Sequence, residues 1–211
     1  MAPSSGSSLA RRERAALCDL AVRVGPEAPT LCTGWSVRDL VVHLLIRERK
    51  PWAAGGIVLP ALARMTDGAA ADLARRPLPE LVDRLRTPPL PLRLGAVDAL
   101  ANTIEFFVHH EDIRRAQPSW ESRPLSSSDQ AALWRSLSLV GRGLVRSAGV
   151  PVIISAGSRR AVLRAGDEPV VVSGPVGELA LFLFGRAQVT GLTFDGPAAK
   201  VSALQAANLG F

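Results

Sequence analysis

The chain has 211 residues, of which 47% are hydrophobic and 21% are charged, and its formal net charge is +6. This balance indicates a soluble globular protein of one large or two small domains, and it excludes a disordered chain or a small disulfide-stabilised scaffold. No apolar run approaches the roughly 18 residues of a membrane-spanning helix. No apolar core follows the basic start of the chain, so we expect no secretory signal, no membrane partner and a cytoplasmic protein.

The positive charge comes almost entirely from arginine, since Lys50 and Lys200 are the only lysines. Nucleic-acid binding requires clustered positive charge, but the adjacent arginines form only short pairs, and no basic helix is interleaved with aromatic residues. The bias toward arginine, alanine, glycine and proline is typical of a GC-rich genome. We therefore expect no nucleic-acid partner.

Apolar periodicity predicts helices over the first two thirds of the chain. Ser36 begins one of them, with Asp39 three residues later in a capping-box arrangement, and Pro51 ends it. Between Trp52 and Pro91 the pattern weakens to short helical pieces such as Glu80–Arg86. The remaining strong segments are Ser8–Val24, Gly95–Ala116 and Ser128–Ser147. Four long amphipathic helices with one irregular crossover predict a four-helix bundle in residues 1–148.

After Gly149 the periodicity changes to short segments rich in valine and isoleucine, separated by glycine-containing turns. The predicted strands are Val150–Ala156, Ala161–Arg164, Pro169–Ser173 and Gly191–Phe194, and the predicted helices are Val176–Arg186 and Ala198–Ala207. Residues 149–211 are therefore expected to form a compact domain of mixed structure, which makes the whole chain α+β.

The two cysteines, Cys18 and Cys32, lie 14 positions apart. A cytoplasmic protein rarely forms a disulfide, and this spacing matches no zinc ribbon. The residue types favour two small buried hydrophobes. Cys32 is notable because it lies just before the helix that carries His43.

The three histidines fall on two predicted helices: His43 on the second, and His109 with His110 on the third. Steps of 3, 4 and 3 residues place Asn102, Glu105, His109 and Asp112 on one narrow stripe of a helix, spanning about 80°. This stripe is expected to face the bundle interior, where polar groups are costly without partners.

A divalent metal ion would satisfy these polar groups. Glu105 and His109, four residues apart on a helix, can bind one ion together, and His43 can supply a third ligand from the neighbouring helix. Three protein ligands leave one position open, as is typical of catalytic sites. Asn102 or Asp112 would then orient a ligand through a hydrogen bond.

The same residues have a second interpretation, a buried hydrogen-bonded network in which Glu105 pairs with an arginine. His110 points about 100° away from His109, so we expect it to support the site or to pack between helices. Glu48 is either an alternative ligand or the partner of a buried arginine.

Two sequence blocks resemble the N-terminal metal-binding domain of mycothiol-dependent maleylpyruvate isomerases, a branch of the DinB-like four-helix bundles. They are Leu-Cys-Thr-Gly-Trp-Ser-Val-Arg-Asp-Leu-Val-Val-His-Leu at 31–44 and Glu-Phe-Phe-Val-His-His-Glu-Asp at 105–112. The block at 108–116 is similar to an uncharacterised actinobacterial subgroup. The stretch at 174–186 is similar to the sterol-carrier-like domain that follows the bundle in these proteins.

The resemblance implies zinc as the metal, with His43, Glu105 and His109 as ligands, and mycothiol as the thiol co-substrate. It also implies a catalytic role for Arg186, for which the residue type alone equally favours a helix-end arginine that satisfies carbonyl groups. We expect an isomerase or thiol transferase that acts on a small electrophilic substrate. The alternative is a non-catalytic, metal-stabilised protein with an apolar ligand pocket lined by Val171, Leu181, Phe182 and Phe184, although these residue types favour an ordinary core over a pocket.

Overall fold

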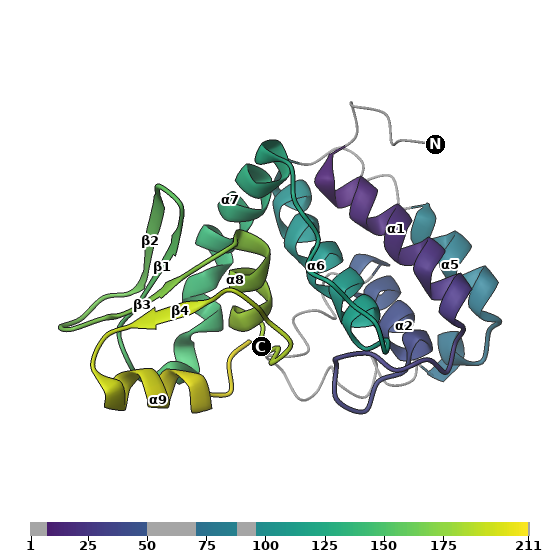
Figure 1. Ribbon diagram of the computed structural model, residues 1–211. Coiled ribbons are helices and arrows are strands. Elements are labelled where there is room, and N and C mark those ends of the chain that lie inside the picture. The colour runs from purple at the N-terminus through teal and green to yellow at the C-terminus, as the bar shows by residue number, and fades with distance from the viewer. Residues whose placement is uncertain (1–7, 50–70, 88–95, 211) are drawn as a thin grey trace. The chain divides into compact units, whose positions relative to one another are not determined.

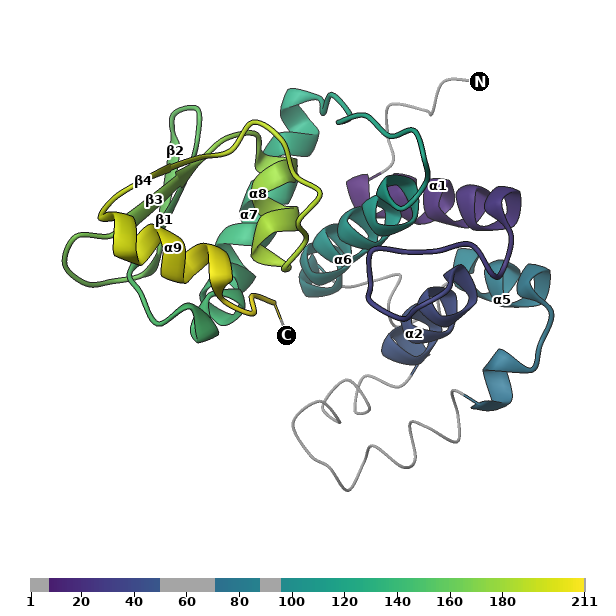
Figure 2. The same cartoon turned by 60° about the horizontal axis from the view of Figure 1, so that its bottom comes forward.

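The computed structural model describes residues 8–49, 71–87 and 96–210. The expected helix end at Pro51 and most of the weakly helical stretch that follows lie outside these residues. The chain divides into two compact units, Met1–Glu121 and Ser122–Phe211 (Figure 1, Figure 2). Helices together with a mixed four-stranded sheet give an α+β protein, as predicted from the change in periodicity.

The first unit is helical in the part that the structure describes. Its named helices are α1 (Leu9–Val24), α2 (Val37–Arg49), α5 (Leu78–Arg86) and α6 (Ala96–Arg115). Helix α1 packs against both α5 and α6, and α2 packs against α5. Fully buried side chains from each helix, including Leu17, Leu44, Leu81 and Phe106, form one apolar core. This core holds the two helices that carry the histidines.

Helix α2 begins with the capping box that the sequence predicts. The backbone N–H of Ser36 donates to Asp39 Oδ2 at 2.9 Å, and the backbone N–H of Asp39 donates back to Ser36 Oγ at 3.3 Å. Each side chain thereby satisfies a backbone donor that the first turn leaves without an intrahelical partner. The cap fixes where α2 starts, and hence where His43 lies two turns later.

The second unit combines helices with the sheet. Its elements are α7 (Ser127–Leu144), a 3₁₀ turn at Arg146–Ala148, β1 (Val152–Ala156), β2 (Arg159–Arg164), β3 (Val170–Ser173), α8 (Val176–Leu183), β4 (Thr193–Asp195) and α9 (Ala198–Ala206). The strand order is β2-β1-β3-β4, with β1 and β3 parallel and the two outer pairs antiparallel. Every residue of α8 is buried, and α8 packs against α7.

Helix α7 belongs to the second unit, because it packs against both α8 and β2. A Cβ atom built on Gly141 of α7 would lie 2.8 Å from the side chain of Leu163 on β2, so the helix approaches the strand closely. The sequence pattern instead assigned this helix to the bundle, with a boundary after residue 148. That boundary stays a prediction, since compactness alone does not establish which part folds independently.

Helix α8 ends earlier than the periodicity predicts, at Leu183 instead of Arg186. Gly185 adopts a left-handed conformation with φ +80°, and its N–H donates to the carbonyl of Phe182 at 2.9 Å. Glycine adopts such a conformation without the steric cost that a side chain would add. The apolar pattern continues past Leu183 because it indicates which residues are buried and does not indicate where the helix ends.

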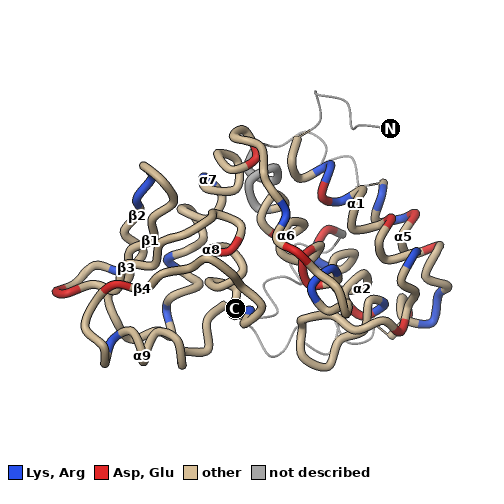
Figure 3. Tube along the Cα trace, viewed as in Figure 1, with Lys and Arg blue, Asp and Glu red and all other residues tan. Residues whose placement is uncertain are grey.

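Among the residues that the structure describes, no helix is both long and apolar enough to cross a membrane. Arginine and acidic positions are both present along α1 and along α5 (Figure 3). This mixture agrees with the absence of long basic runs in the sequence. The lack of a nucleic-acid partner remains a prediction.

Candidate metal centre

The structure brings His43 of α2 next to Glu105 and His109 of α6. One donor atom from each residue lies within 4.8 Å of the other two. His109 Nε2 is 3.5 Å from Glu105 Oε2, and the two imidazole rings are 5.4 Å apart and nearly perpendicular. Two nitrogens and one carboxylate oxygen are a suitable donor set for a zinc-like divalent ion. That these three residues bind a metal stays a prediction.

The opposite edge of the His109 ring faces Asp112. His109 Nδ1 lies 2.9 Å from Asp112 Oδ2, and Asp112 is fully buried. A carboxylate in this position accepts a hydrogen bond from Nδ1–H, so Nε2, which faces Glu105 and His43, is the nitrogen at which an ion can replace a proton. The pairing orients the ring for the role that the helical stripe predicts for it, with Asp112 as the supporting residue.

Cys32 also meets Asp112, from the loop that precedes α2. Its thiol donates to Asp112 Oδ2 at 3.2 Å. Cys32, His109 and Asp112 therefore form a second group whose donor atoms all lie within 4.8 Å of one another. The expectation of two small buried hydrophobes suits Cys18, which is fully buried. It does not describe Cys32, which is only half-buried and has a polar partner.

The loop from Pro29 to Ser36 is held by its own hydrogen bonds. Trp35 N–H donates to the carbonyl of Cys32 at 2.9 Å, and the hydroxyl of Thr30 donates to the carbonyl of Trp35 at 2.9 Å. The N–H of Leu31 donates to the backbone carbonyl of Asp112 at 3.0 Å, which ties the loop to α6. The loop thereby carries Cys32 to one side of the His109 ring and the indole of Trp35 to the ring of His43, 5.0 Å away.

Burial keeps His43 neutral at physiological pH. Loss of hydration disfavours the imidazolium, and repulsion by His109 adds to this effect, so the pKa of His43 falls from 6.5 to about 4. A neutral imidazole has a free lone pair, which metal binding requires. His43 therefore needs no deprotonation step to act as a ligand at neutral pH.

Glu105 and His109 stabilise each other in their charged forms. Burial by itself would raise the pKa of Glu105, but the hydrogen bond with His109 and the charge of Arg47 outweigh it and lower the pKa. Burial would likewise lower the pKa of His109, but its bonds to Asp112, Cys32 and Glu105 raise the pKa well above the usual value. Without a metal, His109 is the cation that these carboxylates hold. An ion bound at Nε2 would replace the proton on that nitrogen.

Arg47 is a member of the site that the sequence reasoning missed. It lies one turn after His43 on α2, with Nε 3.4 Å from Glu105 Oε2 and Nη1 donating to Asn102 Oδ1 at 2.7 Å. The same spacing of four residues that joins Glu105 to His109 would have identified it. The structure thus contains the arginine pair of Glu105 from the second interpretation as well as the histidines of the first. Asn102 contacts Arg47, and this contact positions it beside the candidate ligands.

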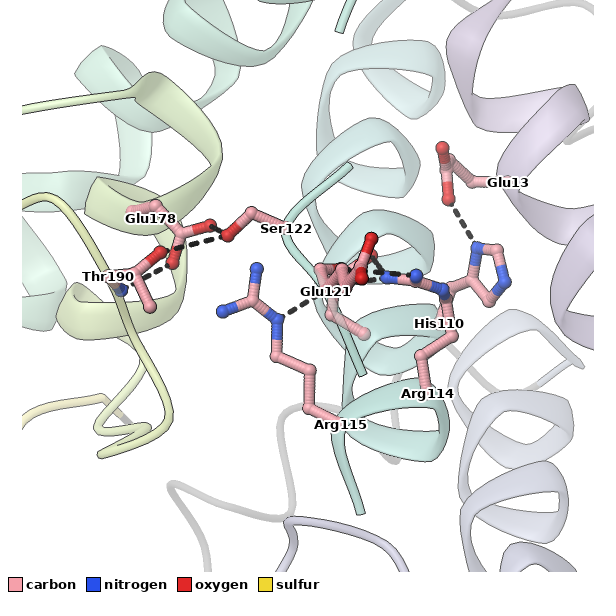
Figure 4. A network of polar contacts seen from close by, with 9 residues as sticks. Glu13, His110, Arg114, Arg115, Glu121, Ser122, Glu178 and Thr190 are labelled. Atoms are coloured by element: carbon pink, nitrogen blue, oxygen red, sulfur yellow. Dashed lines mark hydrogen bonds and ion pairs between the residues drawn. The ribbon is translucent and has the colours of Figure 1, made fainter. Parts of the chain in front are cut away.

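His110 points to a different partner from that of His109. Its Nδ1 atom lies 2.6 Å from Glu13 Oε2 on α1, and Figure 4 shows the two side chains directed at each other across the helix pair. Glu48 also has its own partner, because Arg14 Nη1 donates to Glu48 Oε2 at 2.7 Å and both are buried. The structure therefore favours Glu48 as the partner of a buried arginine, one of the two roles expected for it.

Arg186 lies in the second unit, three residues past the end of α8, where its guanidinium donates to the carbonyl of Phe184. Such a contact is typical of an arginine that satisfies a helix terminus. The catalytic role implied by the resemblance stays a prediction.

Leu181, Phe182 and Phe184 are buried, and the ring of Phe182 packs edge-on against that of Phe194 at 5.2 Å. This packing matches their expected alternative role as core residues.

No family model matches the chain, and no curated protein matches it in sequence. Among solved structures, the crystal structure of the mycothiol-dependent maleylpyruvate isomerase is similar, with a TM-score of 0.57 and 16% identity over 89% of this chain and 90% of that chain. A histidine-to-alanine mutant of that enzyme gives a TM-score of 0.58 at the same identity and coverage. The similarity extends over most of both chains and establishes a maleylpyruvate isomerase-like fold.

Proposed function

We propose that this chain is a metal- and thiol-dependent enzyme, an isomerase or S-transferase that uses mycothiol on a small electrophilic substrate. The observation that carries the proposal is the convergence of His43, Glu105 and His109. It occurs in a fold similar to that of the mycothiol-dependent maleylpyruvate isomerase. A site of two histidines and one carboxylate leaves a coordination position for an exogenous ligand. We propose that the bound ion is zinc.

The residues present fit such an ion by their chemistry. His43 is neutral at physiological pH, Glu105 is ionised, and Asp112 accepts a hydrogen bond from Nδ1–H of His109, so that Nε2 can bind the ion once it has released its proton. When bound, a zinc-like ion would keep the sulfur of a small thiol in its thiolate form, which is the nucleophilic one. The chain itself orients the ligands and places two partly exposed side chains, Cys32 and Trp35, beside them.

The second contribution of the chain is recognition of the electrophile. Trp35 has 38% of its surface exposed and lies beside His43, so its indole can cover an apolar or unsaturated part of a substrate. Arg186 is proposed to pair with a substrate carboxylate, since its guanidinium offers two parallel donors. Both isomerisation and thiol transfer begin with addition of the thiolate to the electrophile, and they differ in whether the thiol later leaves.

The ligand assignment is tested by measuring the metal content of wild type against His109→Ala, Glu105→Ala and His43→Ala. We expect about one ion per wild-type chain and loss of that ion in each variant. His110→Ala is the matched control, because it removes a neighbouring histidine of the same helix whose partner is Glu13. Metal retained in the His109 or Glu105 variant would refute the proposed ligands.

Catalysis is tested separately, with the zinc-loaded protein, mycothiol and a panel of small electrophiles that includes maleylpyruvate. Turnover in wild type, with KM raised in Arg186→Ala while the metal content is unchanged, is the expected result. Absence of turnover across the panel by a fully metal-loaded protein would refute the enzymatic proposal. It would support instead the non-catalytic, metal-stabilised binding protein.

A further inference from the structure

We propose that Cys32, Asp112 and the Nδ1 atom of His109 form a second metal site, which binds thiophilic divalent ions such as Cd²⁺. This site lies on the other edge of the His109 ring from the proposed zinc ligands. The donor atoms of its three residues already lie within 4.8 Å of one another. Neither the sequence pattern nor the similarity to the isomerase implies it.

The distances are close to those of a coordinated ion. Tetrahedral bonds of zinc-like length separate neighbouring ligand atoms by roughly 3.4–3.7 Å. In the structure, Asp112 Oδ2 is 3.2 Å from Cys32 Sγ and 2.9 Å from His109 Nδ1. Binding would open these separations by less than about 1 Å. Rotation of the half-buried Cys32 side chain can open the first separation, and a small rotation of the Asp112 carboxylate can open the second.

The donor chemistry sets the preference between the two sites. Thiolate favours soft ions, whereas imidazole with carboxylate suits zinc and harder divalent ions. The proposed zinc site has no sulfur among its ligands. We therefore expect Cd²⁺ to bind preferentially at the site that contains Cys32.

Occupation of the second site is balanced by proton release. The Cys32 S–H bond breaks, its proton leaves to solvent, and the sulfur binds the ion as thiolate. The proton on His109 Nδ1 is lost and the neutral ring carries its proton on Nε2, which faces Glu105 Oε2 at 3.5 Å. A neutral imidazole has one lone-pair nitrogen, so an ion at Nδ1 and an ion at Nε2 exclude each other. This exclusion rests on the proposed function, whereas the second site itself does not.

The test is a titration of the metal-free, full-length chain with Cd²⁺ alone, followed by the ultraviolet charge-transfer absorption of a cadmium–thiolate bond. We expect a band equivalent to one thiolate per chain, and its loss in Cys32→Ser. Cys18→Ser is the matched control and should keep the band, because Cys18 is fully buried and its thiol contacts a backbone carbonyl of α5. No band in wild type, or a band that survives in Cys32→Ser, would overturn the proposal.

Two further variants separate this site from the proposed zinc site. His43→Ala should keep the cadmium–thiolate band, and its loss there would show that Cys32 belongs to a single shared site. Asp112→Asn should weaken Cd²⁺ binding by roughly tenfold or more, and an unchanged affinity would remove Asp112 from the site. Far-ultraviolet circular dichroism of each variant verifies its fold. Failure of the zinc ligands would appear as retained zinc in the His109 or Glu105 variants, which is a distinct result.

The exclusion is measured by loading wild type with Zn²⁺ before the Cd²⁺ titration. We expect zinc to weaken the apparent binding of Cd²⁺, and to do so in proportion to its own concentration. In His43→Ala, the same zinc concentration should have a much smaller effect. Equal Cd²⁺ affinity with and without bound zinc in wild type would refute the shared use of His109.

Discussion

His109 and His110 are neighbours on α6, yet they lie in two different polar regions. His110 belongs to a paired region, in which each basic side chain meets one carboxylate: His110 with Glu13, and Arg14 with Glu48. His109 belongs to the candidate centre, where several donors converge on one ring. Both regions bury polar groups, but only the second gathers enough donors for an ion.

The difference shows how burial alone fails to identify a metal site. A buried charge with one opposite partner is satisfied and structurally constrained, and removing either partner leaves the other charge uncompensated. The Nε2 edge of His109, by contrast, faces both Glu105 and His43, and a metal ion can substitute for the proton between them. The paired region should therefore affect stability, and the candidate centre should affect metal content.

The largest effect is expected from breaking the paired region with Glu48→Gln. This change leaves the guanidinium of Arg14 without its buried counter-charge and should lower the free energy of unfolding by about 3–5 kcal/mol, measured by urea denaturation. Asp72→Asn is the control, because Asp72 pairs with Arg75 at the surface, where both side chains are 72% exposed. The zinc content per folded chain should not change. Loss of zinc with intact stability would reverse the roles assigned to the two regions.

An intermediate effect is expected from pH, through His43. Its folded pKa is about 4 and its usual pKa is 6.5, so between these values the unfolded chain binds the proton more readily. The contribution of His43 to stability is present above pH 6.5 and is lost as the pH falls toward 4, by at most roughly 3 kcal/mol. Urea denaturation of the metal-free chain across this range measures it.

His43→Asn is the comparison that isolates this contribution, because it removes the titrating group. His109 acts with the opposite sign: its raised pKa adds stability at low pH, and this is lost as the pH rises through the folded value. The difference between wild type and His43→Asn cancels the His109 contribution to a first approximation. The same slope in both proteins would contradict the assignment to His43.

The smallest effect is expected from Arg47, the cation that lies beside the candidate centre. Arg47→Met removes a positive charge near the ion and a competitor for Glu105. It should raise Zn²⁺ affinity by roughly two- to tenfold, the size of a partly screened charge interaction. Competition with a coloured chelator measures the change. Arg38→Met is the control on the same helix, since Arg38 donates to the carbonyls of Ala74 and Arg76. Weaker zinc binding in Arg47→Met would indicate that Arg47 instead holds Glu105 in position.

The features that the sequence predicts well are those that depend on neighbours along the chain. The capping box of Ser36 and Asp39 and the alignment of Glu105 with His109 follow from helical spacing alone. The convergence of His43 on that stripe was expected only as one of two interpretations, because spacing along one helix does not specify which residues of another helix face it.

The features that could not be predicted join distant parts of the chain. Cys32 and Asp112 are 80 positions apart, and Glu13 and His110 are 97 apart. No local pattern indicates these pairings, since they depend on how the loop and α1 pack against α6. Arg47 is the exception, because it lies within one turn of His43 and the same spacing rule applies to it.

The loop from Pro29 to Ser36 makes three kinds of structural contact within eight consecutive positions. Its two ends are paired as an isolated bridge, its middle is bonded to α6, and its last residue caps α2. A single inserted residue would change the spacing between the thiol, the indole and the start of the helix, each of which has its own partner. Variation in length is therefore expected to be less tolerated here than the substitution of most of its side chains.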